Sequence, residues 1–220
     1  MNRRELLVLG ALWPLSAAAA PAKKKADAEE GVGPIEDLMR EHGVLRRITI
    51  IYDEAERRLA AGEKLDLSAL HTAAGLVRSF VEDYHERDEE QYIFPRFEKQ
   101  KQLPELVATL RAQHQKGRAL TDQILQLSSS APPADLAKRL GPPLQQFNRM
   151  YRAHAAREDT VLFSALHKLL SAKEIDQLGE KFEQIERSTF HGDGFDQAID
   201  QVAAIERAYD LSDLATFTPR

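Results

Sequence analysis

The sequence predicts an all-α protein: an antiparallel, up-down four-helix bundle with additional C-terminal helices. Apolar residues recur at helical spacing through four long segments, and no segment alternates as a half-buried strand would. Prolines and glycines separate these segments from one another. The connections are of modest length, which favours antiparallel neighbours in an up-down bundle.

Start and stop signals set the expected boundaries of the bundle helices. Asp66 is a plausible N-cap for the second helix, and we expect Pro95 to stop it. Pro104 suits the first position of the third helix. A short turn at residues 134–140 is expected to be broken by Gly141-Pro142-Pro143 before the fourth helix. The predicted bundle helices are therefore residues 35–60, 66–94, 104–127 and 143–170.

Further helices are expected after the bundle. Ser171 to Glu174 has the pattern of a capping box, which opens a helix. A glycine-containing loop at residues 191–194 precedes a last helix at 195–209. The predicted organisation is an export signal at 1–22, a linker at 23–33, the bundle at 34–170 and a C-terminal helical extension at 171–220.

The first residues read as a targeting segment. Arg3 and Arg4 precede an apolar run, which is followed by small residues and an Ala20-Pro21-Ala22 cleavage pattern. The run is short for a bilayer span. We expect a cleavable signal, read by the Sec or the twin-arginine route, and a periplasmic or otherwise exported mature chain outside the membrane. An uncleaved membrane anchor is the alternative.

Composition narrows the chemistry. The chain has 220 residues, a formal net charge of −5 and no basic block in its body, so we expect no nucleic-acid partner. It has no cysteine, which excludes disulfides, thiolate catalysis and cysteine-based zinc or iron–sulfur sites. Histidines and carboxylates must therefore carry any metal or acid–base chemistry.

Several of these polar residues interrupt the apolar stripes of the predicted helices. At about 100° per residue, His42 and His114 fall in the middle of the first and third stripes. His154 and Glu158 both lie within the fourth stripe. Pairs of histidine and carboxylate at i,i+4 lie on one helix face and can reach one ion.

The second helix is less clear. His85 and Glu89 follow one edge of its stripe, whereas Asp88 lies nearer the centre, so spacing does not choose between Asp88 and Glu89. Because successive helices alternate in direction, all the histidines of the four stripes fall near one level of the bundle.

A bound metal explains this polar level. Burying so many ionisable groups without compensation would cost several kcal/mol each. Glu89 and Glu158 come from facing helices, and carboxylates with two oxygens can hold a pair of ions. Mixed nitrogen and oxygen ligands at high coordination number suit iron or manganese better than a closed structural zinc site.

Four segments carry a resemblance to a known family: EHGVLRR, YHERDEEQYIFP, LRAQHQKGRAL and YRAHAAREDTVLF. In this order, from about Ile35 to Leu170, they resemble the hemerythrin-like, or HHE cation-binding, domain. The resemblance implies two non-haem iron ions, ranked above manganese or zinc, with Glu89 and Glu158 as bridges. It implies these terminal or additional ligands: His42, His85, Glu86, His114 and His154.

The sequence also departs from the hemerythrins that carry oxygen. Those proteins place a second histidine one turn before the third-helix ligand, where this chain has Leu110. They use an aspartate five residues after the fourth-helix histidine; Asp159 has that spacing, although Glu158 points more directly inward. One imidazole fewer leaves an open coordination position or a weaker site.

These observations favour an exported di-iron protein that binds metal and a diatomic ligand, oxygen or nitric oxide, for sensing, storage or iron handling. Two alternatives remain open. One is a di-iron oxidoreductase or peroxidase of the same fold, so the sequence does not decide whether the chain is an enzyme. The other is a metal-free helical interaction module. The oligomeric state is not indicated.

Overall fold

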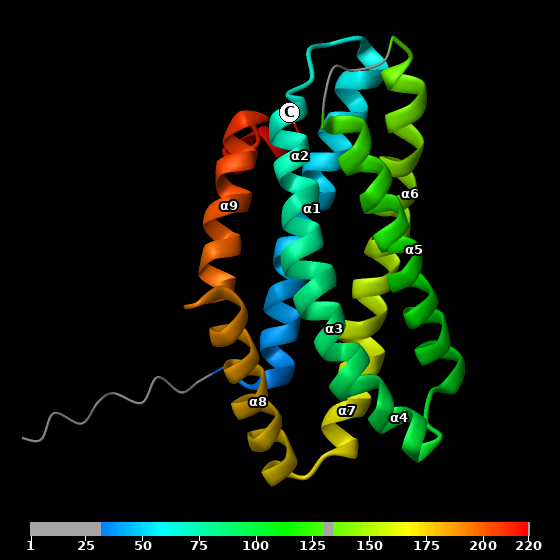
Figure 1. Ribbon diagram of the computed structural model, residues 1–220, viewed down its shortest axis with the longest axis vertical. Helices are drawn as coiled ribbons and strands as arrows, with labels where there is room; N and C mark the ends of the chain where they lie inside the picture. The colour runs from blue at the N-terminus through cyan, green and yellow to red at the C-terminus, as the bar shows by residue number, and fades with distance from the viewer. Residues whose placement is uncertain (1–31, 130–133, 220) are drawn as a thin grey trace, which may run out of the picture. The chain divides into compact units, whose positions relative to one another are not determined.

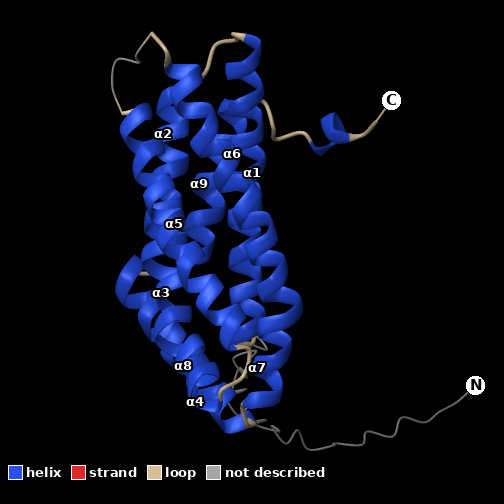
Figure 2. Cartoon of the chain, turned by 90° about the vertical axis from the view of Figure 1, so that its right-hand side faces the viewer, coloured by secondary structure: helices blue, strands red, loops and turns tan. Residues whose placement is uncertain are grey.

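Four long helical segments lie side by side and form a bundle, which two further helices cover (Figures 1 and 2). The computed structural model describes residues 32–129 and 134–219. The predicted export signal and most of the predicted linker lie outside the described residues. The described part contains helices and no strand, which confirms the all-α helical bundle with additional C-terminal helices.

The bundle helices have the following bounds. The first is α1, Pro34–Ala61. The second is continuous through α2 Leu67–Leu76, η1 Val77–His85, α3 Glu86–Asp88, η2 Glu89–Ile93 and α4 Phe94–Gln100. The third is α5, Pro104–Ser128. The fourth runs through α6 Leu136–Arg157, η3 Glu158–Leu162 and α7 Phe163–Leu169.

The C-terminal extension adds α8, Ala172–Phe190, α9, Gly194–Ala208, and the short 3₁₀ helix η4, Leu214–Phe217. The predicted capping box is present, because the Ser171 and Glu174 side chains each bond the other residue's backbone N–H. The α9 helix is fixed to α1 by Glu206, which accepts two hydrogen bonds from Arg47. The Tyr209 hydroxyl donates to the Asp66 carbonyl at the start of α2.

Two predicted helix breaks are wrong. Pro95 does not end the second helix, which continues to Gln100. The preceding π turn places Pro95 in the first turn of α4. At that position the backbone N–H that proline lacks is not required for a helical hydrogen bond. Pro142 and Pro143 lie inside α6. The carbonyls that lose their donors belong to the exposed residues 138 and 139, where water can bond them.

Three π-helical stretches, η1, η2 and η3, interrupt the second and fourth bundle helices. In each, a backbone N–H bonds the carbonyl five residues earlier; that of Phe94 bonds Glu89, and that of Phe163 bonds Glu158. A π turn holds more residues than the 3.6 of an α turn, so each residue rotates less than 100°. These wide turns change which side chains face the bundle interior.

The core consists of two apolar clusters separated by a polar level. One cluster contains Ile48, Tyr52 and Phe147, and the other contains Phe94 and Phe163. On each bundle helix, one histidine lies in sequence between residues of the two clusters. The polar level is therefore enclosed by apolar packing on both sides.

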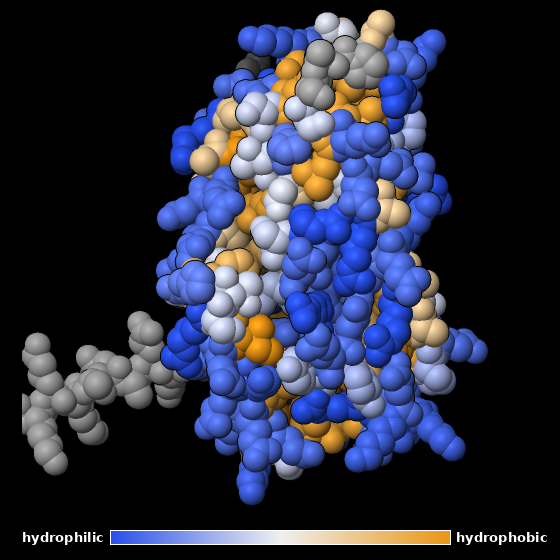
Figure 3. All heavy atoms as spheres, viewed as in Figure 1, coloured by the Kyte–Doolittle hydropathy of each residue, from blue (hydrophilic) through white to orange (hydrophobic). Residues whose placement is uncertain are grey.

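One face of the described part is mainly polar. Hydrophilic side chains cover most of the face seen in Figure 3, with smaller apolar areas between them. Within residues 32–129 and 134–219, no helix is both long and apolar enough to cross a membrane.

Candidate metal centre

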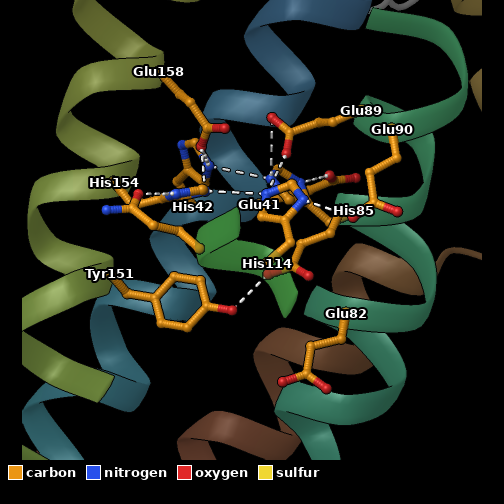
Figure 4. A network of polar contacts seen from close by, with 12 residues as sticks. Glu41, His42, Glu82, His85, Glu89, Glu90, His114, Tyr151, His154 and Glu158 are labelled. Atoms are coloured by element: carbon orange, nitrogen blue, oxygen red, sulfur yellow. Dashed lines mark hydrogen bonds and ion pairs between the residues drawn. The ribbon is translucent and has the colours of Figure 1, made fainter. Parts of the chain in front are cut away.

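The polar level gathers one histidine from each bundle helix and two glutamates around a common point (Figure 4). Each of these six side chains belongs to a residue that is at most 3% exposed. The two glutamates are the first residues of η2 and η3, so both stand at wide turns. The six residues are His42, His85, Glu89, His114, His154 and Glu158.

The four imidazoles form two pairs. His42 Nε2 lies 3.1 Å from His85 Nε2, and His114 Nε2 lies 3.2 Å from His154 Nε2. Glu158 joins the pairs, because its Oε2 is 3.3 Å from His42 Nε2 and 3.0 Å from His154 Nε2. One carboxylate thus touches one imidazole of each pair.

Glu89 joins the pairs from the opposite helix. Its Oε1 lies 3.8 Å from His85 Nε2, and its Oε2 lies 3.5 Å from His114 Nε2. The two oxygens therefore face different histidine pairs. The centre has two halves, each with two imidazoles, and both halves share the same two carboxylates.

The structure places Glu89, and not Asp88, at this centre. Asp88 precedes it in the chain and faces α8 instead, as described below. The predicted angles assumed an uninterrupted α-helix. Because the wide turns of η1 and η2 reduce the rotation per residue from Val77 onward, Glu89 turns toward the centre of the apolar stripe and Asp88 turns to its side.

A ring of hydrogen bonds orients the imidazoles through their Nδ1 atoms. His85 Nδ1 lies 2.6 Å from Glu41 Oε2, and His42 Nδ1 lies 2.7 Å from Asp159 Oδ1. Arg46 in turn pairs with Asp159. A neutral histidine that donates its Nδ1 hydrogen presents the Nε2 lone pair to the centre.

The other two imidazoles complete this ring. His114 Nδ1 lies 2.9 Å from Glu90 Oε1, and His154 Nδ1 lies 2.9 Å from Gln113 Oε1. On each of the first three bundle helices, one side chain thus bonds the histidine Nδ1 atom of the following helix. On the fourth helix, Asp159 bonds the histidine of the first. The sequence pattern did not indicate that these residues are acceptors, although each is the direct neighbour of a ligand candidate on its own helix. Asp159 is therefore an acceptor for His42, while Glu158 faces the Nε2 atoms.

The shared carboxylates have few partners. Among the described residues, their oxygens make no well-aligned hydrogen bond, and their close polar neighbours are the imidazoles of the centre. Unpaired buried carboxylates are strongly disfavoured, and bound cations remove that penalty. The donor set therefore fits a pair of metal ions, which the four Nε2 atoms and these oxygens would hold.

The electrostatics of the two carboxylates differ. Burial, reinforced by the nearby Glu158 charge, raises the pKa of Glu89 well above its usual value. Burial also opposes ionisation of Glu158, but His154 and His42 outweigh it and hold its pKa well below the usual range. Two facing carboxylates with no cation between them repel each other, and a cation relieves this repulsion.

The histidines also differ. Burial lowers the pKa of His114 to about 4, and burial together with the His42 charge lowers that of His85 well below 6.5. For His42, the contacts with Asp159 and Glu158 outweigh burial and raise the pKa to about 9. Metal binding at the His42 half therefore competes with protonation of this imidazole.

Glu86 is buried but has other partners. The Tyr151 hydroxyl donates to Glu86 Oε1 at 2.6 Å, and an Arg118 nitrogen lies 3.1 Å from Oε2. Glu86, Glu90 and His114 form a separate cluster of potential ligands. Tyr151 fits against Gly117, where an added Cβ would lie 1.9 Å from its hydroxyl oxygen. In this structure Glu86 is therefore held by a tyrosine and an arginine.

A four-helix bundle with imidazoles and shared carboxylates at one enclosed level defines a class of metal-binding helical proteins. The particular family follows from comparison with known proteins. Residues 33–166 match the hemerythrin HHE cation-binding domain, and the chain belongs to this family. The predicted family is confirmed, and with it the assignment as a metal-binding protein.

Similar proteins occur in mycobacteria. An uncharacterized protein of Mycobacterium bovis and two of Mycobacterium tuberculosis strains are each 41% identical over 233 residues. The match covers 100% of this chain and 91% of each relative. No solved structure matches the chain with significance.

Proposed function

We propose that the chain binds two non-haem iron ions in this centre and that iron there binds a diatomic ligand, oxygen or nitric oxide. The observation that carries the proposal is the division into two halves, each with two imidazole Nε2 atoms, around two buried carboxylates whose neighbours are these imidazoles. His42 and His85 would hold one ion, His114 and His154 the other, and Glu89 and Glu158 would span both.

The donor count supports ligand binding. Each half offers two imidazoles and a share of two carboxylates, which is fewer donors than a six-coordinate iron takes. Leu110 lies in the apolar cluster beside the His114 half and is 1% exposed, so it adds no donor there. Iron in this site would supply the free coordination positions at which a small ligand binds.

Export is part of the proposal and rests on the first residues alone. The basic start, short apolar run and small-residue cleavage pattern support a periplasmic or otherwise exported mature chain. Mass measurement of the chain recovered from the exported fraction tests this. We expect a mature N-terminus near residue 23; an intact Met1 in that fraction would contradict cleavage.

Metal analysis tests the centre. After anaerobic reconstitution with iron(II) and removal of free metal, we expect about two irons per chain, as the two halves require. His114→Ala should lower this content, whereas His71→Ala, a histidine bonded to Ser128 outside the centre, should not. A content near zero in the unmodified chain would refute the proposal. Spectral changes on adding oxygen or nitric oxide to the loaded protein test ligand binding separately.

A further inference from the structure

A polar cleft of about 240 Å³ lies between the second bundle helix and α8. One wall comes from the η1–η2 region, where the ligand candidates His85 and Glu89 are located. The other wall comes from α8, which follows the part of the chain that matches the family. The lining residues are Asp83, Arg87, Asp88, Gln91, Tyr92, Ile185, Ser188 and Thr189.

Aromatic contacts hold the two walls in place. The rings of Tyr92 and Phe182 lie 6.0 Å apart, and those of Tyr84 and Phe190 lie 5.1 Å apart. The α8 partners are about two turns apart, and Ile185, Ser188 and Thr189 lie between them in sequence. The cleft is therefore a fixed opening between anchored helices.

Asp88 is the unusual residue of this cleft. It is 3% exposed, yet none of the described residues forms a hydrogen bond or an ion pair with its carboxylate. The charges of Arg87 and Lys181 act on it, but neither residue forms an ion pair with it. A buried carboxylate that lines a polar cleft without a partner is suited to bind a cation.

Two carboxylates connect Asp88 with the centre. The charge of Glu41 acts on Asp88, and Glu41 Oε2 contacts His85 Nδ1 at 2.6 Å. Next to Asp88 in the chain is Glu89, whose Oε1 faces His85 Nε2. Asp88 thus lies in the cleft and is directly followed in the chain by a ligand candidate of the centre, whose own ligands are buried.

We propose that this cleft is the route by which divalent cations reach the centre, with Asp88 as a transient oxygen ligand. The inference rests on the proposed function and adds a site and a role for α8. A carboxylate in a cleft with low-dielectric walls attracts cations, which raises their local concentration and the association rate. Polar lining groups such as Gln91 and Ser188 can replace part of the hydration shell of the ion.

Cobalt(II) uptake by the metal-free full chain tests this route, because its absorption reports binding without turnover. Asp88→Asn should slow uptake about five- to tenfold, while the final number of ions per chain stays the same. Its rate should also depend less on salt than the rate of the unmodified chain. Asp88→Glu should restore rapid uptake.

Two further variants complete the design. Ser188→Lys places a positive charge on the exposed α8 wall, far from the ligands in sequence, and should also slow uptake. Asp200→Asn, the same chemical change at an exposed α9 residue outside the cleft, should leave the rate unchanged. Equal rates for the unmodified chain, Asp88→Asn and Ser188→Lys, with full final loading, would overturn the inference alone. Failure of the unmodified chain to bind two ions would overturn the proposed function as well.

Discussion

Replacing Glu89 by glutamine should change stability in opposite directions with and without metal. Glu89 is fully buried, and its oxygens lie 3.8 and 3.5 Å from the His85 and His114 Nε2 atoms without a donor. In the metal-free chain the amide removes a buried carboxylate and can donate to one of these nitrogens. Relieving an unsatisfied buried group is worth about 1–3 kcal/mol. The metal-free variant should therefore unfold at a temperature higher by roughly 2–4 °C per kcal/mol.

With metal bound, the unmodified chain should unfold at the higher temperature, because the neutral amide of the Glu89→Gln variant is a poor bridge between two cations. Iron at 100 times its Kd stabilises the unmodified chain by about 2.7 kcal/mol for each occupied site, and the variant should lose most of this gain. Thermal unfolding followed by circular dichroism, after chelator treatment and after anaerobic iron(II) loading, measures both states.

A matched control lies two turns away on the same helix. Glu82 is equally buried, but it accepts a hydrogen bond from Thr121 and pairs with Arg78 at 3.0 Å. Glu82→Gln should therefore destabilise the chain to the same extent with and without iron. If Glu89→Gln instead lowers the unfolding temperature equally in both states, Glu89 has a packing role and the reasoning is refuted.

Three further predictions concern the surroundings of the centre. Asp159→Asn should weaken iron binding about 10- to 100-fold in a chelator competition, because the imidazole it orients loses a carboxylate acceptor; unchanged affinity would contradict this. Gly117→Ala should cost about 1–3 kcal/mol in urea unfolding, since its Cβ would overlap the Tyr151 hydroxyl, whereas Gly75→Ala, with open space around it, should cost nothing. Neighbouring arginines lower the pKa of Glu54 to about 2. Its stabilising effect, below about 1 kcal/mol, should be complete above pH 4.5 and disappear as the pH falls through 2; a difference between the chain and Glu54→Gln that persists at pH 2 would refute it.

Helical periodicity was sufficient to predict the fold, because every bundle helix carries an apolar stripe along most of its length. It failed at Pro95 and at Pro142-Pro143, where proline normally breaks a helix. The π turn before Pro95 and the exposed carbonyls before Pro142 accommodate these residues. Neither feature has a signal in the pattern of apolar residues.

The ligand candidates were predictable because they replace apolar residues at positions that the stripes require to be buried. Their hydrogen-bond acceptors were not, because each acts on a histidine of another helix. Glu41 and Gln113 precede His42 and His114 in the chain but contact His85 and His154. Such pairings depend on which helices are neighbours and on their relative height, and one sequence does not encode this in any local pattern.

The ring around the imidazoles is chemically uneven. In one half, the Nδ1 atoms of both histidines contact carboxylates. In the other half, His154 Nδ1 contacts the neutral amide of Gln113. A carboxylate behind an imidazole makes it a stronger electron donor. If iron occupies both halves, the two ions are inequivalent, and removal of a single electron would be localised at the one held by His42 and His85.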